Sequence, residues 1–230
     1  MVLVARREPA LRDVAARCGG NAHVIVADAA VRGDVTRAVA GAIAHFGHID
    51  VWINNAGRGI TRLPSQLTDA DVNDMMQVNA MSVLYGMQEV LPHFVERDAG
   101  HIINVSSMLA RLPFAPLRSA YSAAKHFVNA LTADFRTEVQ QQYPGIHVSL
   151  VSPGVVHTDF GLHALHGGPD SRSVPNAQTS EEVAAIIATV IETRRPDTYT
   201  RANSAQLVRD YYEAIATTGA PPAAPATTER

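Results

Sequence analysis

Short apolar segments rich in valine and isoleucine alternate along the chain with longer segments of helical periodicity. Segments this short and this apolar are typical of strands buried on both faces, as in a parallel sheet. Because helical segments separate them, the pattern predicts βαβ units and a three-layer, Rossmann-like α/β fold built on a doubly wound parallel sheet. The apolar segments cover residues 2–4, 23–27, 49–53, 102–105 and 146–151.

Helices are expected between these strands and after the last of them. Thr68 followed three residues later by Asp71 is typical of a helix start, and Ser180 is placed to cap the helix that follows it. Tyr199 is expected in a last short strand. The predicted helices cover residues 9–17, 34–46, 68–96, 118–143, 181–192 and 204–216.

The pattern indicates one domain over residues 1–218, with no internal repeat and no linker to a second domain. Residues 219–230 contain three prolines and no large apolar residue. A segment of this composition cannot bury enough apolar surface to offset its loss of conformational entropy on folding. We therefore expect it to be a disordered tail.

Charge and composition exclude several classes of protein. The chain has 230 residues, with 19 Lys and Arg against 22 Asp and Glu, whereas nucleic-acid binders usually show a basic excess. No uninterrupted apolar run approaches the ~18 residues of a membrane span, and the opening MVLVARRE is the reverse of a secretory signal. Cys18 is the only cysteine, so no intrachain disulfide forms. We expect a cytoplasmic protein whose partner is a small molecule, not nucleic acid or membrane.

Tyr121 and Lys125 carry the main chemical signal. They lie four residues apart in the sequence YSAAK, which places both side chains on one face of the predicted helix. A nearby ammonium group is expected to lower the pKa of the phenol from its usual ~10, so that the tyrosine can exchange protons as a general acid or base. The same spacing often occurs by chance as a surface pair, so its context decides its meaning.

That context consists of polar residues at the carboxyl ends of predicted strands, where open α/β sheets bind ligands. Ser107 ends the segment HIINVSS, the turn NNAG ends at Gly57, and PGVVHT follows another strand. Asn79 stands in an otherwise apolar helix and needs a partner. His163 and His166 have helical spacing but no third ligand, so we expect them to line a pocket and expect no metal site.

Together these motifs resemble the short-chain dehydrogenase/reductase family, in its order and at nearly its spacings, from residue 2 to about 212. The resemblance implies hydride transfer between a nicotinamide and the carbon of a carbonyl or a secondary alcohol. Tyr121 would pass the proton, Ser107 or its neighbour Ser106 would hold the substrate oxygen, and Lys125 would tune the tyrosine and hold the nicotinamide ribose. Asn79 would bind a water on the proton path, the alternative being a helix-distorting structural amide.

The resemblance also predicts how the cofactor is recognised. Arg6 and Arg7 follow the first strand with no acid at its tip, and a guanidinium can clasp a 2′-phosphate, so NADP is expected over NAD unless both arginines are merely solvated. Asp28 would lie beside the adenine or, alternatively, cap a turn. Family members usually pair subunits through the two long helices, which implies a homodimer or homotetramer. The remaining expected cofactor contacts are Asn55, Ala56, Gly57, Tyr121, Lys125, Pro153, Gly154 and Thr158.

One part of the family pattern is missing. Members begin with a strand and a glycine-rich turn of the TGxxxGIG kind, and no such turn precedes Asn54. We therefore expect an N-terminally truncated or mis-started enzyme whose first βα unit is absent, with two strand edges facing each other across a gap and no NADPH binding at micromolar concentration. The alternative is a non-catalytic relic that acts as a binding or interaction protein.

Overall fold

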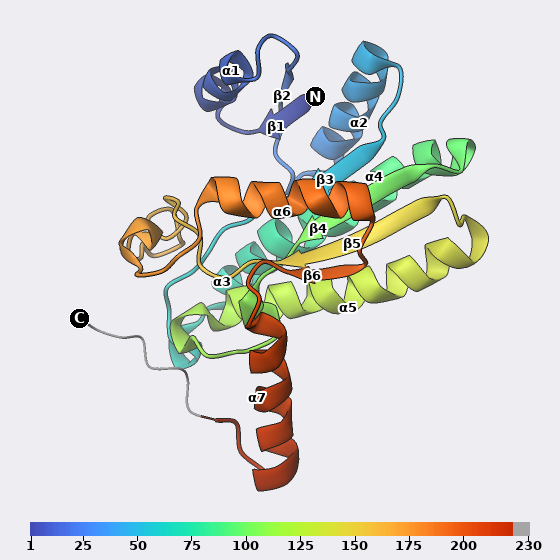
Figure 1. The fold of residues 1–230 in the computed structure, drawn as a ribbon. Helices are drawn as coiled ribbons and strands as arrows, with labels where there is room; N and C mark the ends of the chain where they lie inside the picture. The colour runs from blue at the N-terminus through green and yellow to red at the C-terminus, as the bar shows by residue number, and fades with distance from the viewer. Residues whose placement is uncertain (223–230) are drawn as a thin grey trace.

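The computed structural model describes residues 1–222, so residues 223–230 of the expected tail lie outside the described part. Helices and strands alternate within it, as the hydrophobic pattern predicts (Figure 1). The elements are β1 (Val2–Ala5), α1 (Glu8–Arg17), β2 (His23–Val26), α2 (Arg32–Phe46), β3 (Val51–Asn54), α3 (Asp69–Met76), α4 (Ser82–Arg97), β4 (Gly100–Val105), α5 (Ser119–Gln142), β5 (Ile146–Ser152), α6 (Ser180–Thr193), β6 (Asp197–Tyr199) and α7 (Ser204–Thr218).

The strands form two separate parallel sheets. One contains β1 and β2, and the other has the order β3-β4-β5-β6. Within residues 1–222 no ladder joins β1 to β3, so the sheet is interrupted between these two strands, as expected from the sequence. In Figure 1 the two-stranded sheet lies with α1 at one end of the molecule, away from β5 and β6.

The four-stranded sheet has helices on both faces. Neighbouring residues of a strand point to opposite faces, and Ile102 and Ile103 of β4 accordingly enter different cores. Ile102 packs in a large cluster with residues of α2, α4 and α5. Ile103 packs with Val151 of β5 and Val190 of α6 on the other face. The result is the three-layer α/β arrangement that the sequence predicts.

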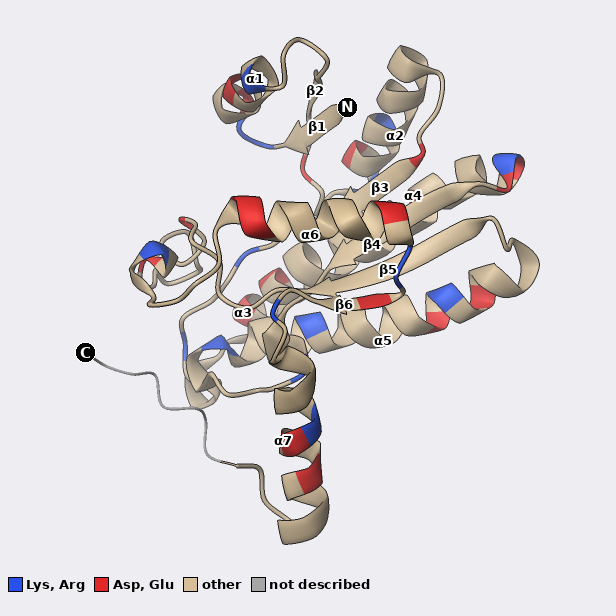
Figure 2. Ribbon diagram, in the orientation of Figure 1, with Lys and Arg blue, Asp and Glu red and all other residues tan. Residues whose placement is uncertain are grey.

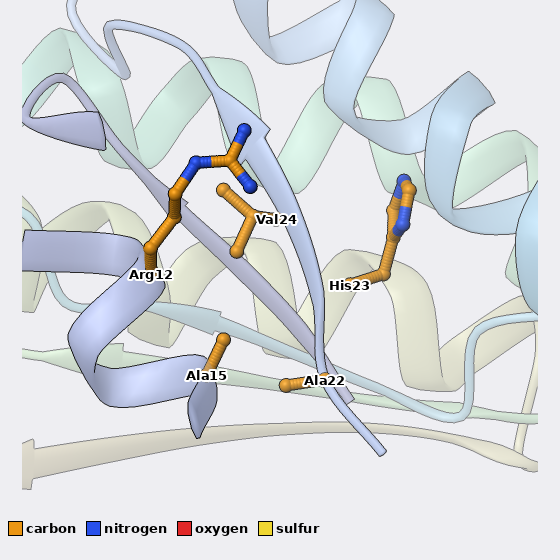
Figure 3. Close-up of a pocket in the computed structure, with 5 residues that line it drawn as sticks. All are labelled: Arg12, Ala15, Ala22, His23 and Val24. Atoms are coloured by element: carbon orange, nitrogen blue, oxygen red, sulfur yellow. The ribbon is translucent and has the colours of Figure 1, made fainter. Parts of the chain in front are cut away.

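The two-stranded sheet is covered much less well. None of the residues in β1 and β2 is buried, and Val4 and Val26 are 40% and 45% exposed. Leu11 is the buried residue of α1, which packs on both strands. Figure 3 shows a surface hollow between α1 and β2, lined by Arg12, Ala15, Ala22, His23 and Val24, where none of the expected catalytic residues lies.

The long helix expected over residues 68–96 is divided into three parts. Thr68 and Asp71 form the predicted capping box of α3, and a π-helical turn over Gln77–Met81 then leads into α4. Such turns arise where a side chain competes for the helical hydrogen bonds, and the amide of Asn79 donates to Met75 O at 3.1 Å. At α6 the capping residue is Thr179 and not Ser180, because the Thr179 hydroxyl accepts from Glu182 N.

Charged residues of both signs are scattered over the elements in the view of Figure 2. None of the helices described is both long and apolar enough to cross a membrane. Neither observation adds a partner to the small-molecule ligand expected from the sequence.

Candidate active site

The expected site residues converge at the carboxyl ends of β3, β4 and β5. Ser107 follows β4, the turn 54–57 follows β3, and Pro153 follows β5. Tyr121 and Lys125 lie in the first two turns of α5, which packs against β5 and the turn after β4. This is the edge of an open α/β sheet at which ligands bind.

Tyr121 lies near Ser107 and the ring of Phe160. Its ring makes an edge contact with Phe160, with 5.7 Å between centroids, and the Ser107 side chain is near enough to lower the pKa of the phenol. The hydroxyl of Ser106 instead donates to Asn129 Oδ1 at 2.5 Å. Of the two serines considered from the sequence, the structure therefore brings Ser107 to the tyrosine.

The pKa of Tyr121 moves in the direction opposite to the one expected from the sequence. Burial raises it, and this effect outweighs the hydrogen bond from Ser107 and the positive charge of Arg118, which both lower it. Lys125 Nζ lies 5.9 Å from the centre of the tyrosine ring. The expectation that Lys125 lowers the pKa of Tyr121 is thus not met, because removal of the phenolate from water has the larger effect.

Lys125 is a buried ammonium group without a carboxylate partner among residues 1–222. Its Nζ donates to Val105 O at 2.9 Å, and burial lowers its pKa to about 8. An ammonium has three donors, so this contact leaves hydrogen-bonding capacity unused. A buried, under-satisfied donor at this edge fits the ribose hydroxyls of a nicotinamide nucleotide.

Asn79 ties the π-helical turn to the turn after β3. Its Oδ1 accepts from Arg58 N at 3.0 Å, and its Nδ2 donates to Arg58 O at 3.0 Å. A Cβ at Gly57 would lie 2.9 Å from this Oδ1 and 3.7 Å from Lys125 Nζ. Asn79 therefore fixes the position of the glycine beside the lysine, and the helix-distorting role considered from the sequence is also present.

A buried polar network beneath the site was not foreseen from the sequence. Asn54 Nδ2 donates to Asn104 Oδ1 at 2.8 Å, and Asn104 Nδ2 donates to Thr132 Oγ1 at 2.9 Å. The network joins β3, β4 and α5 across the core. Gly86 allows it, because a Cβ there would overlap Asn54. The available signal was Asn104 itself, an amide inside the apolar segment HIINV.

The residues expected at the adenosine end lie after β1 and β2. Arg6 and Arg7 are exposed, and Arg6 Nη1 is 3.7 Å from Asp28 Oδ2. Asp28 Oδ1 also accepts from Ala30 N at 2.9 Å, so its turn-capping role is present. Basic groups on the segment between β1 and α1 are visible in Figure 2.

The other expected cofactor contacts line the two turns after β3 and β5. Asn55, Ala56 and Gly57 are exposed, whereas Pro153 is buried and its carbonyl accepts from Met108 N at 2.8 Å. Thr158 Oγ1 accepts from Phe160 N at 3.3 Å and Gly154 lies beside Arg201. These positions fit the two ends of a dinucleotide. Within residues 1–222 no glycine-rich turn leads into a helix between them, so the pyrophosphate has no cradle there.

A loop over the site is fastened by hydrogen bonds. Leu165 N donates to Gly59 O at 2.8 Å, and Thr61 N donates to Leu165 O at 2.9 Å. His166 turns to the buried carboxylate of Asp71, with 2.7 Å between Nε2 and Oδ1, so it braces the loop instead of lining a pocket as expected. His163 pairs with Asp159 on the surface. The described residues contain no cluster that could hold a metal ion.

Comparisons with known proteins agree with this geometry. The model of the short chain dehydrogenase family matches residues 1–165. The chain belongs to this family. An uncharacterized oxidoreductase of Staphylococcus epidermidis is 33% identical over 170 residues, which cover 70% of this chain and 71% of that protein. The mouse dehydrogenase/reductase SDR family member 7B is 31% identical over 212 residues, 86% of this chain and 64% of the relative.

Solved structures of the family share the fold. A short-chain dehydrogenase from Streptomyces avermitilis has a TM-score of 0.80 at 25% identity and covers 94% of this chain and 84% of its own. A family member from Burkholderia phymatum, solved in complex with NAD, has a TM-score of 0.87 at 22% identity. The match covers 98% of this chain and 88% of that protein's chain. With the site described above, the chain is an oxidoreductase of this family that acts on CH–OH or C=O groups.

Proposed function

We propose that the protein interconverts a carbonyl and a secondary alcohol by NADP(H)-dependent hydride transfer, with Tyr121, Ser107, Lys125 and Asn79 as its working residues. The observation that carries this proposal is the buried phenol of Tyr121. The Ser107 side chain is near enough to lower its pKa, and the Lys125 ammonium lies 5.9 Å from the centre of its ring. The bound nicotinamide supplies the hydride.

Tyr121 acts as the proton donor in reduction. Burial raises its pKa, so the phenol carries its proton at neutral pH. A protonated phenol next to the Ser107 hydroxyl offers two donors to one substrate oxygen, which stabilises the negative charge that develops there. This arrangement favours reduction of a carbonyl.

Lys125 and Asn79 organise the surroundings of the tyrosine. The remaining Nζ donors of Lys125 are available to ribose hydroxyls, while Val105 O holds the ammonium in place. The Oδ1 atom of Asn79 already accepts one hydrogen bond from Arg58 N, and its second lone pair is available to a water on the proton path. Loss of either side chain is expected to misplace the turn at Gly57.

NADP is proposed over NAD because the residues after β1 are basic. Arg6 and Arg7 are exposed, and Arg6 makes a long contact of 3.7 Å with Asp28. A 2′-phosphate can therefore recruit either guanidinium without breaking a short ion pair. We also propose a homodimer or homotetramer formed through α4 and α5, where Phe127 is 39% exposed, which light scattering after gel filtration would test.

The proposed hydride transfer is tested by isotope. The 230-residue chain is incubated with millimolar NADPH deuterated at C4 and a set of ketones and aldehydes, and the products are analysed by mass spectrometry. Deuterium on the carbinol carbon of a product, absent with Tyr121→Phe protein, is the expected result. Product that lacks the label, or labelled product at the same rate from both proteins, would contradict the proposal.

A further inference from the structure

Among the arginines near the site, Arg118 differs from Arg58 and Arg62 because it has no acidic partner within residues 1–222. Arg58 pairs with Asp74, and Arg62 pairs with Asp71 at 2.7 Å. Within residues 1–222 no carboxylate lies within 4.0 Å of the Arg118 guanidinium. Removing a guanidinium from water without a counter-ion is costly, and burial accordingly lowers the pKa of Arg118.

The guanidinium is nevertheless held in place. Arg118 Nη1 donates to Ile60 O at 2.9 Å, which uses one of its five N–H donors. The residue is the N-cap of α5, three positions before Tyr121. Arg118 also acts electrostatically on Tyr121 and lowers the pKa of the phenol.

Glycines allow the backbone to pack closely against this cation. A Cβ at Gly59 would lie 2.9 Å from Arg118 Nη1 and 3.0 Å from Cε1 of Phe160, the residue that contacts the Tyr121 ring. A Cβ at Gly168 would lie 3.1 Å from Arg118 Nη2 and 2.9 Å from Thr61 Oγ1. The Thr61 hydroxyl is buried and has no hydrogen-bond partner among the residues that the structure describes. A cation and a second unpaired polar group thus converge beside the proton donor.

We propose that Arg118 binds a carboxylate of the substrate, which makes the preferred substrate a 2-oxo or 3-oxo acid. A guanidinium fork matches a carboxylate in shape and charge. Arg118 is the N-cap of α5, three residues before Tyr121, and its charge acts on the phenol, so a carboxylate bound to the guanidinium would lie near the reacting carbonyl. This inference rests on the proposed function for the identity of the reacting carbonyl, but carboxylate binding can be measured without turnover.

The test compares phenylglyoxylate with its methyl ester, which has the same ketone but carries a methyl group in place of the negative charge. Binding to the 230-residue chain is measured without cofactor by saturation-transfer NMR, for the parent protein and for Arg118→Gln, Arg118→Lys and Arg209→Gln. We expect the parent to bind the acid about tenfold or more tightly than the ester, and Arg118→Gln to lose that preference with ester binding unchanged. Arg118→Lys should retain part of it, and Arg209→Gln, which removes a charge from α7, should retain all of it.

Equal binding of acid and ester by the parent, or a preference that survives in folded Arg118→Gln protein, would overturn the proposal. Tighter binding of inorganic phosphate than of phenylglyoxylate would also overturn it. If Arg118→Gln does not fold, the salt dependence of the parent decides, because the preference for the acid must fall as ionic strength rises. Arg118-dependent binding of the acid without any reduction would contradict the proposed function but support the carboxylate site. Reduction of ketones without a preference for the acid would support the proposed function and contradict the carboxylate site.

Discussion

The two sheets of the molecule differ in how much of their structure is buried. In β4 and β5 nearly every residue is buried, and helices cover both faces. In β1 and β2 no residue is buried, and α1 supplies a single buried leucine. The residues proposed for proton transfer lie on α5, which packs against the four-stranded sheet, and directly after β4. The residues expected to recognise the adenosine follow β1 and β2.

This difference indicates that the two parts of the proposed function, proton transfer and cofactor recognition, depend on structures that are packed to different degrees. Tyr121, Ser107 and Lys125 are placed by a packed core, which holds side chains in single positions. Arg6 and Asp28 are placed by an exposed pair of strands that is not hydrogen-bonded to β3. The proton-transfer geometry should therefore be rigid, and cofactor recognition should be the weaker part.

The largest effect is expected from removing the phenolic hydroxyl. Tyr121→Phe keeps the ring against Phe160 but removes the proton donor, so reduction at millimolar NADPH should fall by about 10²- to 10⁴-fold. Product formation measured by chromatography gives the rate. Tyr143→Phe is the matched control, since that ring lies at the far end of α5, and its rate should equal the parent rate. A Tyr121→Phe rate near that of the control would show that another group donates the proton.

Hydrogen exchange should separate the two sheets directly. Opening of β1 and β2 breaks few buried contacts, so their amides should exchange about a hundredfold faster than those of β4 and β5. Mass spectrometry of peptides from both regions measures this ratio at constant pH. Equal protection in the two sheets would mean that the gap between β1 and β3 does not weaken the smaller sheet.

Acid should destabilise the four-stranded half through His101. Burial in β4 lowers the pKa of His101 from 6.5 to about 4, so between these values the unfolded chain binds the extra proton and stability falls as the pH falls. The loss approaches about 3 kcal/mol near pH 4. The free energy of unfolding, measured by urea between pH 7 and pH 4, should fall less steeply with falling pH for His101→Gln than for the parent. If the two proteins lose stability in parallel as the pH falls, His101 is not held neutral.

The smallest of these effects is expected at the exposed arginines. Arg6→Ala combined with Arg7→Ala should weaken binding of NADPH about tenfold and leave binding of NADH unchanged, because only NADPH carries the 2′-phosphate. Arg17→Ala, at the other end of α1, serves as the control. Equal losses for both cofactors would remove the basis for the NADP preference.

The sequence predicted the element order, most boundaries to within two residues, and the residues that meet around Tyr121. Hydrophobic periodicity carries that information because buried strands and helix faces have different repeats. It did not predict the π-helical turn, since the Asn79 amide acts on Arg58 and Met75, one of them 21 positions away. Contacts of that kind depend on the assembled fold.

The sequence did not predict the direction of the Tyr121 pKa shift or the place of Arg118 in the site, for a related reason. Spacing shows which groups share a helix face, but it does not show how deeply the phenol is buried, and burial outweighs the neighbouring charges. Arg118 was predicted to begin this helix, and in the structure it is the N-cap of α5, three residues before Tyr121. Its lack of an acidic partner within residues 1–222 becomes visible only when the pairs of Arg58 and Arg62 are known.

The central claim is that the residues proposed for proton transfer are brought together while residues 1–222 contain no glycine-rich turn that could hold the phosphates of the dinucleotide. The most direct test measures the reduction rate of the 230-residue chain against NADPH concentration, with Tyr121→Phe protein as the blank. We expect a Tyr121-dependent rate that rises in proportion to NADPH through the micromolar range and does not saturate below about 1 mM, the upper end of usual KM values. Saturation at micromolar NADPH, or no Tyr121-dependent turnover at millimolar NADPH, would contradict the account.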